Sequence, residues 1–294
     1  NWALPALTDY GDGNTFSYEE LAKQIARIHL LFEKSGIRQR DKIALIGKDC
    51  SRWCVVYMAT VTYGAVIVPI LQDFNPNDVQ HIINHSESVL LFAGDRFWES
   101  MDEEKIPAIR AAISLTDFHC IYQKEGEHIS EVLQNMDTLF AEKYPSGFTA
   151  KDIQYVEQSN DKVVLLNYTS GTTGFSKGVM LTGNNLAGNV IYAKTLDVLF
   201  RGERELCFLP LAHAYSCAFN FLVPMAFGAH VTLLGRLPSP KILLKAFQDV
   251  RPNLILTVPL ILEKIYKKMI LPQLEKKSIR VLLRIPLLRT FIYR

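Results

Sequence analysis

The residues best suited to chemistry lie between Thr169 and Lys177. They read Thr-Ser-Gly-Thr-Thr-Gly-Phe-Ser-Lys, a run of hydroxyl groups and glycines that ends in one cation. Gly171 and Gly174 permit backbone angles that other residues avoid, so successive N–H groups can form one concavity for anionic oxygens. The hydroxyls add hydrogen-bond donors, and Lys177 adds a mobile positive charge. The stretch therefore predicts a polyphosphate-binding loop.

Two other interpretations of this stretch fit less well. A flexible linker needs neither a lysine at a set offset nor the apolar strands expected on each side, at 163–166 and 179–181. A kinase-type P-loop, G-x-x-x-x-G-K-[ST], needs glycine where Ser176 stands and a hydroxyl where Gly178 stands. A P-loop also opens a helix, whereas a strand is expected after this loop. Phosphate binding between two strands is favoured.

Strands and helices alternate along the rest of the chain. Short apolar runs predict buried strands at 42–46, 66–70, 89–92, 118–122, 206–209, 231–234 and 254–258. Helical periodicity predicts helices at 17–36, 53–63, 79–83, 129–140, 212–227, 240–250 and 260–270, with a weaker helix between 92 and 118. Ser17 and Glu20 form a capping-box pattern, and Asn185 is expected to cap a helix that runs to about 199. The alternation predicts parallel sheets covered by helices on both faces.

One internal similarity predicts two related lobes. The stretch from Met58 to Val68 parallels the stretch from Leu222 to Thr232, and both run as helix, aromatic residue, Gly, Ala and strand. The alternative is that helix-to-strand turns often use glycine for their own reasons. A cleft between two such lobes is a common place for a bound ligand.

Composition limits the class of protein. The 294 residues are 49% hydrophobic and 21% charged, which is typical of a globular enzyme with a sizeable core. A net charge of +2 argues against nucleic acid as a partner. The cysteines, at 50, 54, 120, 207 and 217, form no C-x-x-C pair, so a reducing, cytoplasmic compartment is expected. Charge-free runs at 53–72 and 206–235 each divide into a buried helix and strand, so neither is expected to span a membrane.

The loop resembles the signature of the adenylate-forming superfamily, which comprises acyl-CoA synthetases, luciferases and peptide-synthetase adenylation domains. That signature reads Y-T-S-G-T-T-G-x-P-K-G-V-M-L-T-H; here Ser176 stands in place of its proline and Gly183 in place of its histidine. Trp53 and the segment 64–69 resemble an early family motif, and Leu-Pro-Leu-Ala-His213 resembles the substrate-side motif. The segment 252–266 resembles the long-chain fatty acyl-CoA synthetase branch. No counterpart of the adenine-binding motif, ribose-binding aspartate, hinge or terminal catalytic lysine follows, so residues 1–294 are expected to be an incomplete N-terminal large adenylation domain.

The resemblance implies ATP-dependent activation of a long-chain fatty acid as an acyl-adenylate, followed by thioester formation with coenzyme A. It assigns phosphate binding to Thr169, Ser170, Gly171, Thr172, Thr173, Gly174 and Lys177. Lys177 would be the catalytic cation and Thr169 would help to hold Mg²⁺. His213, Tyr215 and Phe219 would line the acyl pocket, although His213 could instead be a core histidine. Transfer to an acyl carrier protein, another carboxylate substrate, and a non-catalytic module that holds nucleotide or acyl chain are the alternatives.

Two further patterns carry weaker predictions. His81 and His85 lie four residues apart, as metal ligands on a helix do, but no third ligand is evident and a solvated helix face is favoured. Six basic residues lie among Leu, Ile and Phe in the tail from 276 to 294. Such a segment can lie on an anionic membrane, so peripheral membrane contact is one interpretation. An ordinary amphipathic helix is the favoured one.

Overall fold

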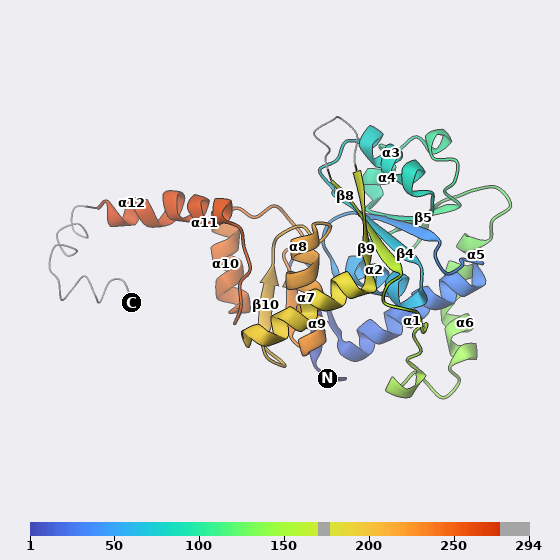
Figure 1. Ribbon diagram of the computed structural model, residues 1–294, viewed down its shortest axis with the longest axis horizontal. Helices are drawn as coiled ribbons and strands as arrows, with labels where there is room; N and C mark the ends of the chain where they lie inside the picture. Colours follow the sequence, from blue (N-terminus) through green and yellow to red (C-terminus); the bar gives the residue numbers. More distant parts are fainter. Residues whose placement is uncertain (170–176, 277–294) are drawn as a thin grey trace.

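Two β-sheets, with helices on their faces and between them, make up the part of the chain that the computed structural model describes, residues 1–169 and 177–276 (Figure 1). The larger sheet has the strand order β7-β6-β5-β3-β4-β8-β9, and the smaller has β10-β11-β1-β2. Most neighbouring strands are parallel; the antiparallel ones, β7, β9 and β2, lie at sheet edges. The fold is therefore the expected α/β arrangement of two related lobes of mostly parallel sheet flanked by helices.

The strands of the larger sheet are β3 (Lys42–Ile46), β4 (Val66–Ile70), β5 (Ser88–Ala93), β6 (Ala111–Ser114), β7 (Cys120–Gln123), β8 (Val163–Thr169) and β9 (Lys177–Thr182). Every residue of β4 is buried, as a continuous apolar run predicts for a strand covered on both faces. The parallel strands β3 to β6 and β8 end at the same edge of the sheet. Loops that follow strands gather at this carboxyl edge.

The smaller sheet joins the first residues of the chain to much later ones. Its strands are β1 (Pro5–Asp9), β2 (Thr15–Ser17), β10 (Arg204–Cys207) and β11 (His230–Leu233). β1 pairs in parallel with β11, with Leu7 opposite Val231. Neither β1 nor β2 was predicted, because neither carries a long apolar run of its own.

The larger helices are α1 (Tyr18–Lys34), α2 (Ser51–Tyr63), α3 (Pro76–Ser86), α5 (Ile129–Gln134), α6 (Met136–Lys143), α7 (Gly183–Leu196), α10 (Pro240–Val250) and α11 (Pro259–Ile265). Shorter ones are α4 (Asp95–Trp98), α8 (Ala214–Ser216), α9 (Val223–Phe227) and α12 (Leu271–Leu274). The predicted capping box begins α1: the Glu20 amide donates to Ser17 Oγ at 3.1 Å, and the Ser17 amide donates to the Glu20 carboxylate at 2.7 Å. The capping box thereby satisfies two backbone N–H groups that have no partner within the helix.

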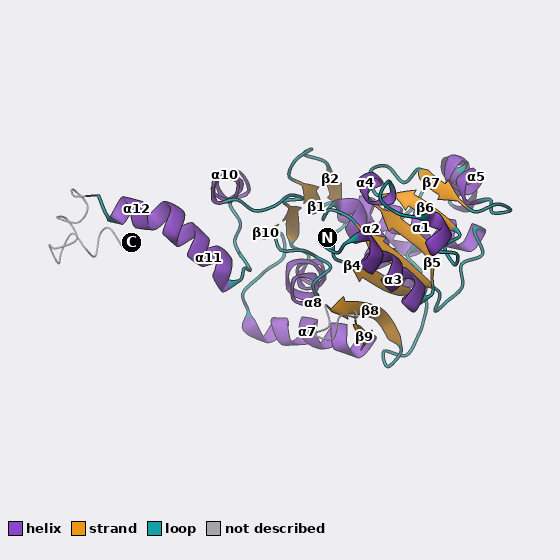
Figure 2. Ribbon diagram, turned by 90° about the horizontal axis from the view of Figure 1, so that it is seen from above, coloured by secondary structure: helices purple, strands orange, loops and turns teal. Residues whose placement is uncertain are grey.

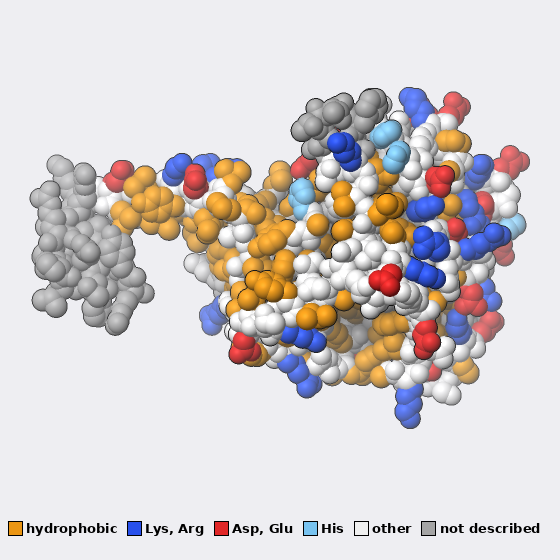
Figure 3. Space-filling view, viewed as in Figure 1, with side chains coloured by type: hydrophobic (Ala, Val, Ile, Leu, Met, Phe, Trp, Pro, Cys, Tyr) orange, Lys and Arg blue, Asp and Glu red, His pale blue; other side chains and the backbone are white. Residues whose placement is uncertain are grey.

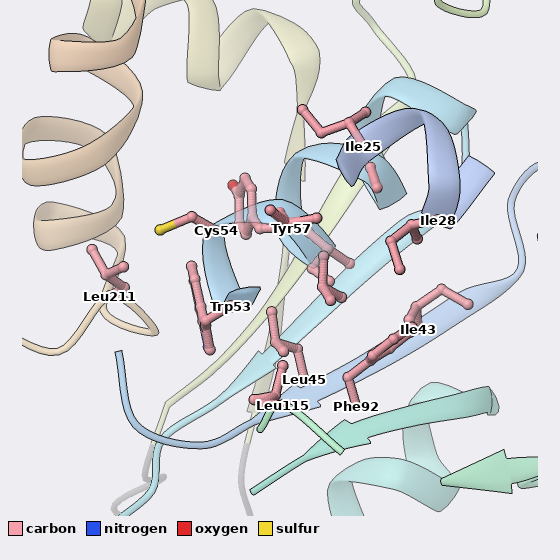
Figure 4. Close-up of a cluster of buried hydrophobic side chains, with 14 of the residues drawn as sticks. Ile25, Ile28, Ile43, Leu45, Trp53, Cys54, Tyr57, Phe92, Leu115 and Leu211 are labelled. Atoms are coloured by element: carbon pink, nitrogen blue, oxygen red, sulfur yellow. The ribbon is translucent and has the colours of Figure 1, made fainter. Parts of the chain in front are cut away.

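Helix α2 is the layer that the two sheets share. Trp53 and Tyr57 on this helix are almost fully buried and stack with ring centroids 5.5 Å apart. Figure 4 shows α2 side chains between Leu211, which belongs to the second lobe, and Leu45 of the first sheet. Helix α3 covers the other face of the larger sheet, and α10 covers the other face of the smaller one (Figure 2). The core is therefore continuous through both lobes.

The internal similarity of the sequence corresponds to the same local geometry in both lobes. Gly64 and Gly228 end their helices with φ of +85° and +73°. The following alanine donates back to the helix in each case, from Ala65 to the Thr60 carbonyl at 3.1 Å and from Ala229 to the Pro224 carbonyl at 3.0 Å. This is the Schellman arrangement, which requires a left-handed residue that glycine adopts without strain.

Several sequence expectations were wrong in detail. The helix expected between 92 and 118 is replaced by α4, a 3₁₀ turn and strand β6. Thr182, rather than Asn185, caps α7, and Asn185 is the reciprocal third residue of that capping box. The helix expected at 129–140 is divided into α5 and α6. In the described part of the chain, the segment 254–258 forms a single bridge, between Leu254 and Glu205, rather than a strand.

The two charge-free runs divide as predicted. Residues 53–72 contain α2 and β4, and residues 206–235 contain the end of β10, the α8–α9 helical segment and β11. Over residues 1–169 and 177–276, we find no helix with the length and apolar character needed to cross a membrane. Helix α11 packs Ile261 and Ile265 against the core of the smaller sheet, and α12 projects away from the two lobes (Figures 1, 2 and 3). The basic tail beyond Lys276 lies outside the described residues.

Candidate functional site

Thr169 and Lys177 face each other across an antiparallel hairpin. Thr169 ends β8, Lys177 begins β9, and the two residues are register partners with exposed side chains. A strand follows the loop, as the sequence predicted, so the loop does not open a helix as a P-loop does. Ser170, Gly171, Thr172, Thr173 and Gly174 lie outside the described residues, and their phosphate-binding role stays a prediction.

The hairpin places both residues at the carboxyl edge of the larger sheet. β8 runs parallel to β4, with Leu165 opposite Ile67, so Thr169 lies at the edge where β4 also ends. In open α/β sheets, ligands bind outside the carboxyl ends of the strands. The location of Thr169 and Lys177 is therefore the one expected for a ligand-binding loop.

A hydrogen bond connects this hairpin to the second lobe. Asn167, two residues before Thr169, donates its side-chain amide to the carbonyl oxygen of Ala212 at 3.0 Å. Ala212 directly precedes His213. The strand that leads into the predicted phosphate-binding loop is thus hydrogen-bonded to the predicted substrate-binding motif, one residue before His213.

A second hydrogen bond connects the segment that carries His213 to the first lobe. The Leu211 amide donates to the Asp49 carboxylate at 3.1 Å, and Asp49 follows the end of β3. Burial raises the pKa of Asp49 to about 7, although the hydrogen bond from Leu211 opposes this shift. The nearby Asp9 accepts from the Ser51 amide at 2.7 Å and thereby binds the start of α2 to the end of β1. Sequence reasoning missed Asn167, Asp49 and Asp9, because their partners are distant along the chain.

His213, Tyr215 and Phe219 lie together on one helical segment. His213 precedes α8 with an exposed side chain, so it is not a core histidine. Tyr215 is 47% exposed, and its ring centroid is 5.4 Å from that of Phe219. Phe219 belongs to a π-helical turn, Cys217–Leu222, a local distortion that is frequent at functional sites. In the described part of the chain these side chains form an open aromatic surface, and their role in acyl binding stays a prediction.

A cavity of about 560 Å³ lies between the carboxyl edges of the two sheets. Its wall includes the cations Lys48, Arg52, Arg96 and Arg236 and the acids Asp9, Asp12, Asp49 and Asp95. The balance of charges suits a polar ligand that carries both donors and acceptors. This cavity lies at the ends of β3, β5 and β6, on the side of the edge away from β8 and β9.

The described residues also bear on metal binding. They contain no group of three or more His, Cys, Asp or Glu side chains that could hold a metal ion. Thr169 offers one exposed hydroxyl oxygen at the strand end, which is a ligand type that Mg²⁺ accepts but only one of about six that it requires. Binding of Mg²⁺ by Thr169 is compatible with this position and stays a prediction.

The chain is similar to one described protein family and to several ligases. The model of a family described as AMP-binding enzyme matches residues 3–288. A long-chain-fatty-acid–CoA ligase of Mycobacterium bovis, FadD15, is 30% identical over 252 residues, which are 84% of this chain and 39% of that protein. 4-Coumarate–CoA ligase 1 of Arabidopsis thaliana is 27% identical over 282 residues, 94% of this chain and 48% of that protein. The chain thus spans less than half the length of these two relatives.

Solved structures share the fold. ATP-bound MatB from Rhodopseudomonas palustris superposes with a TM-score of 0.73 at 19% identity, over 95% of this chain and 50% of that one. The inhibitor-bound N-terminal domain of FACL13 from Mycobacterium tuberculosis also gives 0.73, at 20% identity, over 94% of this chain and 64% of that one. At these identities the similarity establishes the architecture alone.

Proposed function

The chain belongs to the AMP-binding enzyme family, and from this premise we propose that its protein is an acid–thiol ligase that joins a long-chain fatty acid to coenzyme A. The reaction has two steps. An oxygen of the fatty acid carboxylate attacks the α-phosphorus of ATP, and pyrophosphate leaves. The sulfur of coenzyme A then attacks the acyl carbon of the adenylate, the thiol loses its proton, and AMP leaves.

The first step needs alignment and charge neutralisation more than proton transfer. A carboxylate is already ionised at neutral pH, so no general base is required. Two anions must instead be brought together, and the charge on the departing pyrophosphate must be stabilised. Lys177 at the start of β9 is the cation that we assign to the pyrophosphate oxygens. Mg²⁺, when bound, would supply further neutralisation, with Thr169 as one oxygen ligand.

The hydrogen bond from Asn167 to Ala212 is the single observation that carries this proposal. It joins the strand that ends at Thr169 to the segment that leads into His213. A nucleotide bound near the hairpin and an acid bound near His213 would therefore approach each other at the junction of the two lobes.

Three features support a long fatty acid as the substrate. The FadD15 ligase, 30% identical, is named for this activity. The segment 252–266 resembles the same branch of the family, and Tyr215 and Phe219 offer an aromatic surface beside His213. We assign His213, Tyr215 and Phe219 to the acyl site. The 27% identity to a 4-coumarate–CoA ligase makes another carboxylate the second candidate, and an acyl carrier protein is the alternative acceptor.

We further propose that residues 1–294 are the N-terminal part of a larger adenylation domain. The 39% coverage of the FadD15 ligase supports this division. The adenine, ribose and C-terminal lysine contacts of the family would then come from residues outside the sequence described here.

ATP–pyrophosphate exchange by the intact protein tests the proposal. With Mg²⁺ present, exchange should rise through a series of saturated acids from octanoate to palmitate, and 4-coumarate should support little. Coenzyme A should then convert the adenylate to a thioester in a single-turnover assay. Faster exchange with 4-coumarate than with palmitate would replace the substrate assignment. Nucleotide binding without exchange on any acid would favour the non-catalytic module.

A further inference from the structure

Tyr168 occupies the base of the hairpin, one residue before Thr169. Its side chain is only 4% exposed. Its register partner on β9 is Gly178, the residue directly after Lys177. A Cβ atom built on Gly178 would lie 3.1 Å from Cζ and 3.3 Å from the hydroxyl oxygen of Tyr168. The tyrosine ring therefore packs over the β9 backbone at a point where glycine leaves room for it.

A histidine from a third element holds the far end of this ring. His85 lies in the last turn of α3, and its Nδ1 is 2.7 Å from the Tyr168 hydroxyl oxygen. The two rings are perpendicular, at an interplanar angle of 87° with centroids 5.7 Å apart. The ring of His81, one helical turn earlier, is 5.7 Å from that of His85. His81 and His85, for which the sequence favoured a solvated helix face over metal binding, thus lie beside the hairpin, and His85 hydrogen-bonds to it.

Through these contacts, the residues that flank both ends of the loop are connected to helix α3. Tyr168 precedes Thr169, and Gly178 follows Lys177, so a shift of the tyrosine ring would displace both flanking residues. We propose that His85 is a positioning residue that, through the Tyr168 hydroxyl, fixes Thr169 and Lys177 relative to each other for nucleotide binding. This inference rests on the proposed function, because it assigns the ligand of that site to the polyphosphate of ATP.

The chemistry of the contact fits a positional role. Burial raises the pKa of the Tyr168 phenol, which therefore stays neutral near pH 7. A neutral hydroxyl can donate to an unprotonated Nδ1 or accept from a protonated one, so the hydrogen bond forms with either state of the imidazole. His85 is thus expected to act through geometry, without transferring a proton to substrate.

Substitutions at the two residues separate this role from general stability. Tyr168→Phe removes one hydroxyl and keeps the packed ring, whereas His85→Leu removes the imidazole that pairs with this hydroxyl. His85→Asn can return a polar atom near the Nδ1 position, and His85→Gln places its amide closer to the Nε2 position. His119→Leu is a matched control, because His119 pairs with Asp117 at an exposed turn near β7, far from the hairpin.

The assay is steady-state ATP–pyrophosphate exchange by the intact protein, with KM measured separately for ATP and for palmitate. Each of Tyr168→Phe and His85→Leu should lower kcat/KM for ATP about tenfold, since small misplacements of aligned groups cost up to about 100-fold. The double variant should lose no more than either single variant, because both remove the same bond. His85→Asn should recover most of the loss and His85→Gln little, and KM for palmitate should stay within about twofold.

Three outcomes would overturn the inference: unchanged kcat/KM for ATP in both single variants, losses that multiply in the double variant, or an equal rise in KM for palmitate. The Tyr168→Phe arm remains decisive if His85→Leu lowers the Tm. A wild-type protein without exchange on any acid would refute the proposed function instead. In that case the affinity for ATP would be measured by calorimetry. Weaker ATP binding by both variants than by the wild type would support the positioning role, and equal binding would refute it.

Discussion

The Asn167 side chain donates its amide hydrogen to the Ala212 carbonyl oxygen across 45 positions of sequence. The donor lies on β8 of the larger sheet, and the acceptor lies in the segment that follows β10 of the smaller sheet. This bond joins the two predicted halves of the site, so its loss should affect both stability and catalysis.

Replacement of Asn167 by alanine should lower the free energy of unfolding by about 1 kcal/mol, the usual net worth of one such bond. The KM for the fatty acid should also rise, because the segment before His213 loses its hydrogen bond to β8. Asn189→Ala is the matched control, since the Asn189 amide donates to the Asn185 carbonyl on the exposed face of α7. Urea unfolding and exchange kinetics measure the two effects. An Asn167 variant that behaves like the Asn189 variant would contradict the assignment.

Lys177→Ala in the intact protein should lower the rate of acyl-adenylate formation about 100-fold, which is typical for loss of one charge-stabilising group. Lys177→Arg keeps the positive charge and should lose less. Lys162→Ala is the control, because Lys162 is exposed just before the opposite end of β8. Single-turnover formation of the adenylate is the measurement, and an unchanged rate in Lys177→Ala would rule out the loop assignment.

Glu205 should make the protein less stable as pH rises. Its side chain is fully buried, and neither carboxylate oxygen has a hydrogen-bond partner in the described part of the chain. Burial raises the pKa of Glu205 from 4.5 to about 8. The folded state therefore keeps a proton that the unfolded state releases, and stability falls as pH rises from about 4.5 to about 8.

Glu205→Gln removes this titration and keeps the shape of the side chain. The variant should exceed the wild type in stability at pH 8 by an amount on the order of a few kcal/mol, and the difference should shrink toward pH 5. Urea unfolding of both proteins at the two pH values gives the comparison. A difference that is the same at both pH values would show that Glu205 does not titrate in this window.

Two glycine substitutions should act in opposite directions. Gly64→Ala should destabilise the protein by about 1–3 kcal/mol, because Gly64 has a φ of +85° and its new Cβ would lie 2.9 Å from Val156 Cγ1. Gly188→Ala should stabilise it by about 0.5–1 kcal/mol, since Gly188 lies inside α7 with open space around its Cβ position. Thermal unfolding distinguishes them, and a shift of the same sign in both would contradict the backbone argument.

Local patterns predicted the elements whose signals are complete within a few residues. The strand β4 matches its apolar run of 66–70, and α1 begins at the Ser17 capping box. Asn185 was misassigned as a cap because Thr182 and Asn185 form a capping box in which both members are polar. The strand β6 escaped prediction because its residues, Ala-Ala-Ile-Ser, carry little β signal and gain their stability from pairing with β5.

The sequence predicts a chemistry for the site but not the contacts that surround it. Glycine, threonine and lysine in a short stretch between two strands predict an anion-binding loop, and residues 170–176 of this loop lie outside the described part of the chain. The partners of Asn167 and Tyr168 come from distant elements, the segment before α8 and the end of α3. No local pattern encodes such contacts, because they depend on how the strands are ordered in the sheet.

The pairing of β1 with β11 has a consequence for how the polypeptide is made. Thr8 reaches a partner 222 positions later, at His230. A ribosome adds about 5–20 residues per second, so roughly ten seconds or more of synthesis separate the two strands. During that interval the larger sheet has its central strands available, whereas β1 can pair with β2 but not yet with β11, so Leu7 has Phe16 opposite it on one side and lacks Val231 on the other. Nascent chains should therefore complete the second lobe last, and chaperones that shield apolar N-terminal segments would have their greatest effect in that interval.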